Sequence, residues 1–419
     1  MILRGMFWRV ALQSVLYRKT SVLLTVLSIC VSVIVLLGVE HIRHEAKNSF
    51  SKTVSGVDLI VGARGGDVNL LLYSVFRIGN ATNNMSWSSY DAISKQKNVS
   101  WAIPISLGDS HQGYRVVGTS AAYFEHFEYG QSQGLSFKEG RVFDSVLDVV
   151  IGAEVAEALN YQLGQNLVLA HGISKKSFSL HDDMPFKVVG ILKKTGTPVD
   201  QALYVSLEGI EAIHIGWQNG VKLPTKYSGV EELDKTKLTP KTITAVMLGL
   251  RSKMATFQVQ RSINNFKAEP LTAILPGVAL SQLWQMMSVF ENTLRLVSWM
   301  VLVASLLGLS AMLLASMRER ENELRIMRTI GAKPLFIFGL IQIESMMMIL
   351  TSIALAILGL FALIFWGNSL LSEEFGMTLS YRFLNLETGW LLGLVLVGGL
   401  LVSFMPGISA YKTSLGEKK

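Results

Sequence analysis

The sequence is poor in cysteine and in charge. Its single cysteine, Cys30, lies in an apolar stretch, so the chain can form neither an intramolecular disulfide nor a zinc site built on cysteines. Only 16% of the 419 residues are charged, whereas 50% are hydrophobic, which is unusual for a water-soluble protein. The net charge of +7 is not gathered into one aromatic-studded basic patch, so we expect no nucleic-acid partner.

Catalytic signatures are also missing. No Walker A sequence occurs, and the stretch 62–84, which is rich in glycine and asparagine, lacks the Lys-Ser/Thr pair of a phosphate-binding loop. No nucleophile-elbow motif supports Ser-His-Asp catalysis. We therefore expect a non-catalytic chain that binds no cofactor of its own.

Long apolar runs predict four transmembrane helices. The first, residues 21–39, is longer than the apolar core of a typical signal peptide, and no small-residue cleavage site follows it. The segment 1–20 before it is a basic amphipathic helix that we expect on the membrane surface. Its basic residues are Arg4, Arg9, Arg18 and Lys19. The other predicted spans are 286–317, which begins with a stalk, then 335–366 and 387–405.

Residues 40–285 contain no spanning run and predict one large α/β region. Short runs rich in valine, isoleucine and leucine predict its strands. These runs are 58–62, 149–152, 167–170, 186–192 and 202–205. Two helical segments are predicted at 154–159 and 207–215.

The distribution of basic residues predicts the orientation in the membrane. The amino-terminal segment, the loop 318–334 and the tail 406–419 contain most of the Lys and Arg that flank the spans, which is typical of cytoplasmic segments. The short loop 367–386 has two glutamates and one arginine, so it is expected outside. Because one span separates the region 40–285 from the cytoplasmic amino-terminal segment, this region is then also expected outside.

The loop 318–334 is a charged segment between two long apolar runs. Its residues favour a helix with Ile326, Met327 and Ile330 on one side, and Gly331 is a suitable end for it. Pro334 prevents simple continuation of this helix. The pattern alone leaves open whether this helix docks on a partner or is an ordinary basic cytoplasmic loop.

Several motifs resemble those of one family of membrane proteins. Residues 322–332, N-E-L-R-I-M-R-T-I-G-A, are similar to a coupling segment R-E-I-x-L-L-R-A-L-G-A, with Asn322 in place of the first arginine. Residues 342–344, Q-I-E, resemble an L-x-E motif at the start of the third span. Residues 152–167 fit G-x-x-x-A-x-x-L-x-x-x-x-G-x-x-L, and 186–192 resemble F-x-V-V-G-I-L. With the order of spans, these motifs resemble the MacB/FtsX/LolC-like permeases of ABC transporters, the type VII or mechanotransmission group.

The resemblance implies four transmembrane helices with a large α/β extracytoplasmic domain of the MacB periplasmic core type, which contains an inserted second subdomain. It implies a bacterial inner-membrane protein with both termini cytoplasmic. Two permeases, identical or paralogous, would pair and bind two cytoplasmic ATPase subunits, which hold the ATP and Mg²⁺. A periplasmic partner protein is compatible with this plan.

The resemblance also assigns roles to residues. ATPase coupling is expected from Glu323, Leu324, Arg325, Ile326, Met327, Arg328, Gly331 and Ala332. Glu344 lies at the foot of the third span, where we expect it to pair with a loop arginine or with the amino-terminal basic helix.

Two other functions stay open from the sequence. One is an FtsX-like regulator, whose outside domain would control a periplasmic enzyme and transport nothing. The other is handling of a metal such as zinc, since imidazole and carboxylate groups cluster in the outside region. The candidate ligands are His171, His181, Asp182 and Asp183. The alternative for this cluster is a polar hairpin turn between the strands 167–170 and 186–192.

Overall fold

The computed structural model describes residues 13, 17–53, 55–172, 184–215, 217–218, 221–222, 238–319, 321–375 and 380–415. The chain divides into two compact units. The first, here called the membrane unit, comprises Met1–Glu45, Ser288–Leu370 and Leu379–Lys419. The second, here called the sheet unit, comprises Ala46–Met287 and Leu371–Thr378.

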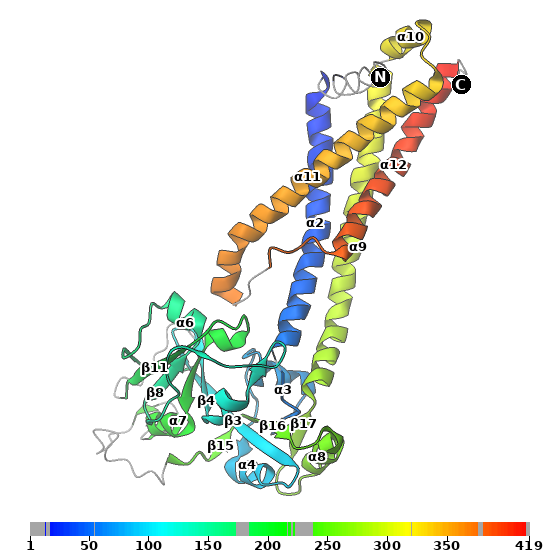
Figure 1. Cartoon of the computed structure of the whole chain (residues 1–419). Coiled ribbons are helices and arrows are strands. Elements are labelled where there is room, and N and C mark those ends of the chain that lie inside the picture. Colours follow the sequence, from blue (N-terminus) through cyan, green and yellow to red (C-terminus); the bar gives the residue numbers. More distant parts are fainter. Residues whose placement is uncertain are drawn as a thin grey trace. The chain divides into compact units, whose positions relative to one another are not determined.

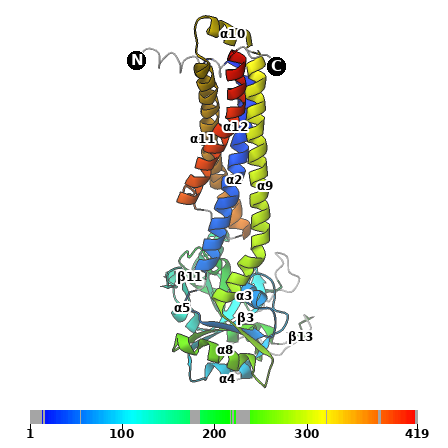
Figure 2. The same ribbon diagram turned by 90° about the vertical axis from the view of Figure 1, so that its right-hand side faces the viewer.

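Among the described residues, four helices are long and apolar enough to cross a membrane. They are α2 (Lys19–Lys52), α9 (Pro276–Glu319), α11 (Pro334–Phe375) and α12 (Leu386–Leu415). Figures 1 and 2 show α2, α9 and α12 side by side over much of their length. Each predicted span lies within one of these helices.

The helices extend beyond the predicted spans. α11 continues to Phe375, so the segment 367–386 is not all loop, and α12 continues to Leu415 in the predicted tail. The hydrophobic pattern marks only the residues that fit the bilayer, whereas the helical backbone continues through polar residues that still favour helix. Pro406 lies inside α12, where it removes one backbone hydrogen bond without ending the helix.

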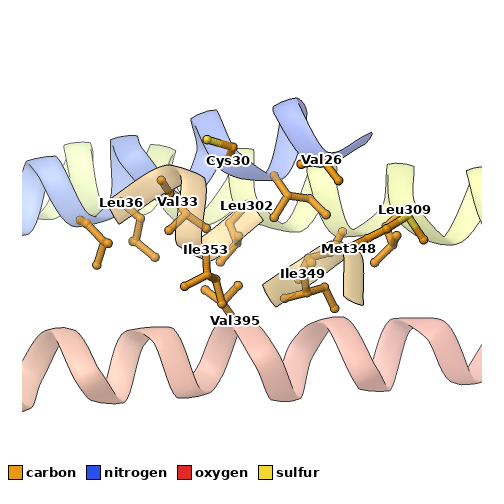
Figure 3. Close-up of a cluster of buried hydrophobic side chains, with 14 of the residues drawn as sticks. Val26, Cys30, Val33, Leu36, Leu302, Leu309, Met348, Ile349, Ile353 and Val395 are labelled. Carbon is orange, nitrogen blue, oxygen red and sulfur yellow. The ribbon is translucent and has the colours of Figure 1, made fainter. Parts of the chain in front are cut away.

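The core of the membrane unit is formed by aliphatic side chains from all four helices (Figure 3). Val33 of α2, Leu302 of α9, Ile349 of α11 and Val395 of α12 are all buried in this core. Cys30 is buried in the same layer. Each helix therefore has one packed face and one face with exposed apolar side chains, as expected for spans that also contact lipid.

The sheet unit is built on an eleven-stranded mixed sheet, as far as the described residues show. Its strands are β1 (Leu59–Ala63), β3 (Val99–His111), β4 (Tyr114–Thr119), β7 (Phe137–Gly140), β8 (Asp148–Ile151), β9 (Asn166–Leu167), β10 (Ala170–His171), β11 (Phe186–Leu192), β12 (Ala202–Ser206), β16 (Ala245–Leu250) and β17 (Leu271–Ile274). The order is β17-β1-β16-β3-β4-β12-β8-β11-β7, with β10 paired to β3 and β9 to β11.

The long strand β3 joins two halves of this sheet. Its first part pairs with β16 and its second part with β4. The chain leaves the first half after β3, builds the second half between β4 and β12, and returns through β16. The second half is therefore an insertion in the first, as the resemblance implied. Within it, β4–β12 and β8–β11 are parallel and the remaining main pairs are antiparallel.

Helices cover both faces of the sheet. In the first half, α3 (Asp67–Ser74) packs with Ile60, while α4 (Trp87–Ser94) and α8 (Thr256–Asn264) pack with Leu59 and Val61 on the other face. This arrangement follows from the alternation of side chains along β1. The second half contains α5 (Ala122–His126), α6 (Ala153–Ala158) and α7 (Leu207–His214).

Shorter elements complete the unit: β2 (Met85–Ser86) with β15 (Thr242–Ile243), β5 (Glu128–Tyr129) with β6 (Gln133–Gly134), β13 (Trp217–Gln218) with β14 (Val221–Lys222), and 3-10 turns at Pro198–Gln201 and Lys253–Ala255. The stretch 62–84 contains α3, whose apolar residues are buried on one side of the helix. One local prediction needs correction. The predicted strand 167–170 is two short strands, β9 and β10, which pair with different neighbours.

Candidate coupling site and a histidine–aspartate cluster

The charged segment between α9 and α11 forms a separate short helix, α10 (Glu321–Thr329) (Figure 1). Gly331 ends it with a φ of 101°, a left-handed conformation that glycine adopts without strain. The Ala332 amide donates to the Met327 carbonyl at 3.0 Å, which is the closing bond of a Schellman motif. Pro334 then begins α11, where its missing amide hydrogen costs nothing.

The surface of α10 combines exposed charge with exposed apolar groups. Ile326 is 60% exposed and Ile330 just after the helix is 82% exposed, while Met327 is half-buried. Glu323 and Arg325 are exposed on the same short helix. The predicted coupling residues Leu324 and Arg328 lie on α10, but their side chains are outside the described set.

Glu344 forms a buried ion pair in the membrane unit. It lies on α11, its side chain is only 3% exposed, and its Oε2 lies 3.1 Å from Arg18 Nη2. This contact joins the start of α2 to α11. From the sequence, Glu344 was expected to pair either with a loop arginine or with the amino-terminal basic segment, and Arg18 belongs to the amino-terminal segment. Lys19 is exposed beside it, whereas Arg4 and Arg9 lie outside the described residues.

Two further polar layers connect α2 to α9. In the apolar core, Ser32 Oγ lies 2.6 Å and Ser28 Oγ 3.2 Å from Ser305 Oγ. Nearer the other end of α2, Arg295 donates to Glu40 at 3.0 Å, and Arg43 also pairs with Glu40. With the Arg18–Glu344 pair, these layers fix α2 to its neighbours at three levels.

His171 has two neighbours that were not among the ligands predicted from the sequence. It lies beside Asp109 and His214, and the candidate ligand atoms of these three residues are within 4.8 Å of one another. His181, Asp182 and Asp183 lie outside the described residues, so their predicted grouping with His171 stays a prediction. Asp109 Oδ1 is 3.0 Å from His171 Nδ1 and 3.7 Å from His214 Nε2, and the two imidazole nitrogens are 3.5 Å apart.

Three elements bring this cluster together. His171 on β10 is the register partner of Asp109 on β3. The register of β3 with β4 shifts between Leu107 and Ser110, and such an irregularity re-aims the side chains beside it. His214 ends α7, and its Nδ1 lies 2.7 Å from the Ile210 carbonyl.

The electrostatics of the cluster favour an ionised carboxylate. Burial raises the pKa of the Asp109 carboxyl, but the His171 and His214 imidazoles outweigh burial and hold that pKa at about 2. Burial lowers the pKa of His214, but its contacts with Asp109 raise it above the ordinary value. At neutral pH Asp109 is therefore an anion between two imidazole rings.

Two family models match the chain. The MacB-like periplasmic core domain matches residues 22–266, which is more than half of the chain. The FtsX-like permease C-terminal domain matches residues 295–416. The chain is a member of the MacB/FtsX-like family of ABC transporter permeases. This membership confirms the resemblance and the fold class that the sequence predicted.

Solved structures of this family are also similar to the permease. The periplasmic region of MacB from Actinobacillus actinomycetemcomitans is 13% identical, with a TM-score of 0.34, and the match covers 56% of this chain and 94% of that one. The extracellular domain of the noncanonic ABC-type transporter YknZ from Gram-positive bacteria is 12% identical, with a TM-score of 0.30, over 52% and 98% of the two chains. No curated protein matches the permease.

The two matched regions contain the two sites. α10 and Glu344 lie in the FtsX-like region, whereas Asp109, His171 and His214 lie in the core-domain region. Sequence reasoning missed Asp109 and His214 because both are far from His171 in the chain, and the three residues meet only through the pairing of β10 with β3 and the position of α7. The local signals were a histidine at the end of a predicted helix and the nearby pair Asp109 and His111, and both are weak.

Proposed function

We propose that this permease couples ATP hydrolysis by a separate ATPase subunit to conformational change of its sheet unit, and that α10 is the helix that docks on the ATPase. The main support is the exposure of Ile326 on α10 and of Ile330 just after it, in a loop between two spans where Gly331 and the Ala332–Met327 hydrogen bond close the helix. Apolar side chains exposed on a charged helix are typical of a helix that binds in a groove of a partner. The absence of a Walker A sequence is consistent with ATP binding on that partner.

Charge supports the same docking mode. Arg325 is a planar guanidinium that can bind a carboxylate of the partner through two hydrogen bonds. Glu323 on the same helix can accept from a basic residue. The apolar side chains would then supply affinity, and the charged pair would set the register of the helix in its groove.

The polar layers along α2 support transmission of movement by stiff helices. α2 has 34 residues and α9 has 44, so they are about 51 and 66 Å long, whereas the hydrocarbon core of a bilayer is about 30 Å thick. Both helices contribute residues to both units. Because Arg18, Ser32 and Glu40 each bond to a neighbouring helix, a displacement near α10 would move α2, α9 and α11 together rather than one helix alone.

The proposed orientation puts α10 and both termini in the cytoplasm and the sheet unit in the periplasm of a bacterial inner membrane. The basic residues around α10 support this orientation. Two permeases, as a homodimer or heterodimer, would bind two ATPase subunits. The small residues Ala304, Gly308 and Ala311 are exposed on α9, which suits the close approach of another helix.

The test is co-purification of the ATPase with a double variant, Ile326→Asp and Ile330→Asp. We expect these changes to lower recovery of the ATPase at least about tenfold, because two apolar contacts are replaced by charges in a groove. Ile78→Asp is the matched control, since Ile78 is 51% exposed in the sheet unit. Undiminished recovery with the double variant, or equal loss with the control, would show that α10 is not the docking helix.

A further inference from the structure

The geometry of the histidine–aspartate cluster points to a second function for the sheet unit. We propose that Asp109, His171 and His214 bind one divalent transition-metal ion, with Zn²⁺ as the best fit, through Asp109 Oδ1, His171 Nδ1 and His214 Nε2. This site is independent of the coupling function proposed for α10.

The distances among the three ligand atoms match those of a zinc site. They are 3.0, 3.5 and 3.7 Å. Tetrahedral zinc with bonds of about 2.0–2.1 Å requires separations of roughly 3.3–3.4 Å between neighbouring ligand atoms. The point equidistant from the three atoms lies about 2.0 Å from each, so an ion can be accommodated with little movement of the side chains.

The hydrogen bond from His214 supports a ligand role for its other nitrogen. A carbonyl oxygen only accepts, so Nδ1 of His214 must carry the hydrogen that it donates to the Ile210 carbonyl. Nε2 of a neutral imidazole in this tautomer carries the lone pair that can coordinate a metal ion, and it is Nε2 that faces Asp109. Metal-binding histidines are commonly oriented by such a bond to a backbone carbonyl.

The carboxylate of Asp109 provides a second, independent observation. The residue is 2% exposed, and Oδ1 accepts no well-aligned hydrogen bond although both imidazole nitrogens are close to it. A buried charged oxygen is costly unless it is paired, and a cation in line with its lone pairs would stabilise it. A metal ion bound by Oδ1 and both nitrogens meets this requirement.

The donor set selects the class of metal. Two imidazole nitrogens and one carboxylate oxygen suit zinc and similar first-row ions, whereas Ca²⁺ and Mg²⁺ prefer oxygen ligands alone. The imidazoles of His171 and His214 are each about one-third exposed. A fourth position is therefore open to water or to a ligand from solution, as in zinc sites with three protein ligands.

Two other histidines of the sheet unit define the limits of the site. His111 is close in sequence to Asp109, but its Nδ1 lies 2.7 Å from the Val168 carbonyl and its Nε2 lies 2.9 Å from the Tyr161 hydroxyl. His126 stacks on Trp101 with ring centroids 5.3 Å apart, outside the cluster. His126 is therefore a suitable control for the loss of an imidazole.

The test is metal binding by the full-length permease in lipid nanodiscs, purified with a tag free of histidine and stripped by a chelator. Titration with Zn²⁺ against a chromophoric chelator should show one ion per chain. His171→Ala and His214→Ala should each weaken binding at least about 100-fold. Loss of a residue that only hydrogen-bonds to a metal ligand already costs about 10–100-fold in affinity, and loss of the ligand itself should cost more. His126→Ala should bind as the unchanged protein does. Retention of binding in either cluster variant, or equal loss in the control, would overturn the proposal.

Because a cluster variant can also disturb folding, the unchanged protein gives a separate readout. Loaded with Co²⁺ in place of zinc, it should show the intense visible absorption of a four- or five-coordinate ion, and Zn²⁺ should abolish it. Weak bands of a six-coordinate ion, or no uptake at all, would show that the three residues form a hydrogen-bonded cluster without metal.

Discussion

The buried pair of Arg18 and Glu344 gives the most quantitative prediction for the membrane unit. Glu344→Ala removes the carboxylate and leaves the Arg18 guanidinium, whose side chain is only 9% exposed, without its 3.1 Å partner. Breaking a buried ion pair by removing one partner costs about 3–5 kcal/mol. Because both side chains are buried, solvent screening does not reduce this figure in the way it does at a surface.

A double variant separates charge from packing at this position. Arg18→Met with Glu344→Leu removes both charges and keeps apolar volume, and replacement of a buried pair by apolar residues is often neutral or stabilising. We therefore expect the double variant to recover most of the stability that Glu344→Ala loses. The free energies of unfolding of the unchanged protein, Glu344→Ala, the single variants Arg18→Met and Glu344→Leu, and the double variant would be measured in one lipid or detergent system.

The reasoning would be refuted by a loss of less than about 1 kcal/mol in Glu344→Ala, which is typical of an exposed pair. It would also be refuted if the double variant were as unstable as the sum of the two single losses, because the two charges would then not be coupled.

Three further predictions concern other parts of the chain. Glu323→Lys and Gly331→Pro should each reduce ATPase co-purification, the first by reversing a docking charge and the second because proline cannot adopt the φ of 101° at that position. Glu269→Ala should destabilise the sheet unit by about 1 kcal/mol in a denaturant titration, because Ser86 and Ser89 lose a charged acceptor that is partly exposed. Burial raises the pKa of Glu269, but these hydrogen bonds lower it overall, so its contribution should be present at neutral pH and lost as pH falls through the lowered pKa. Zn²⁺ affinity should also decrease as the pH falls, because protons compete with the metal for the imidazole nitrogens of His171 and His214. An affinity that does not change between about pH 8 and pH 5 would contradict a histidine-bound ion.

The membrane helices could be predicted from the sequence because a helix that spans the hydrocarbon core of a bilayer requires a long apolar run. Their ends could not, since the polar residues near Phe375 and Leu415 continue the helix without any hydrophobic signal. The strand 186–192 was predicted with its observed bounds, because its apolar residues, among them Val188 and Ile191, are buried between β8 and β7.

The candidate sites differ in how far local sequence defines them. α10 is local: its helix formers and Gly331 lie within a few residues, so its position could be predicted. The metal cluster depends on pairing between distant strands, because His171 and His214 are 43 residues apart and Asp109 is aimed by an irregularity in β3. No periodic pattern in the sequence indicates that Asp109, His171 and His214 lie close together.

The most direct test of the coupling proposal uses the single cysteine of the chain. Cys30 is buried, and Cys30→Ala gives a background in which Ile326→Cys is the only thiol. A maleimide photo-crosslinker at position 326 should capture the ATPase subunit when the complex is assembled, whereas the same probe at Ile78→Cys should not. Absence of the ATPase adduct at position 326, or an equal yield at both positions, would contradict docking of the ATPase on α10.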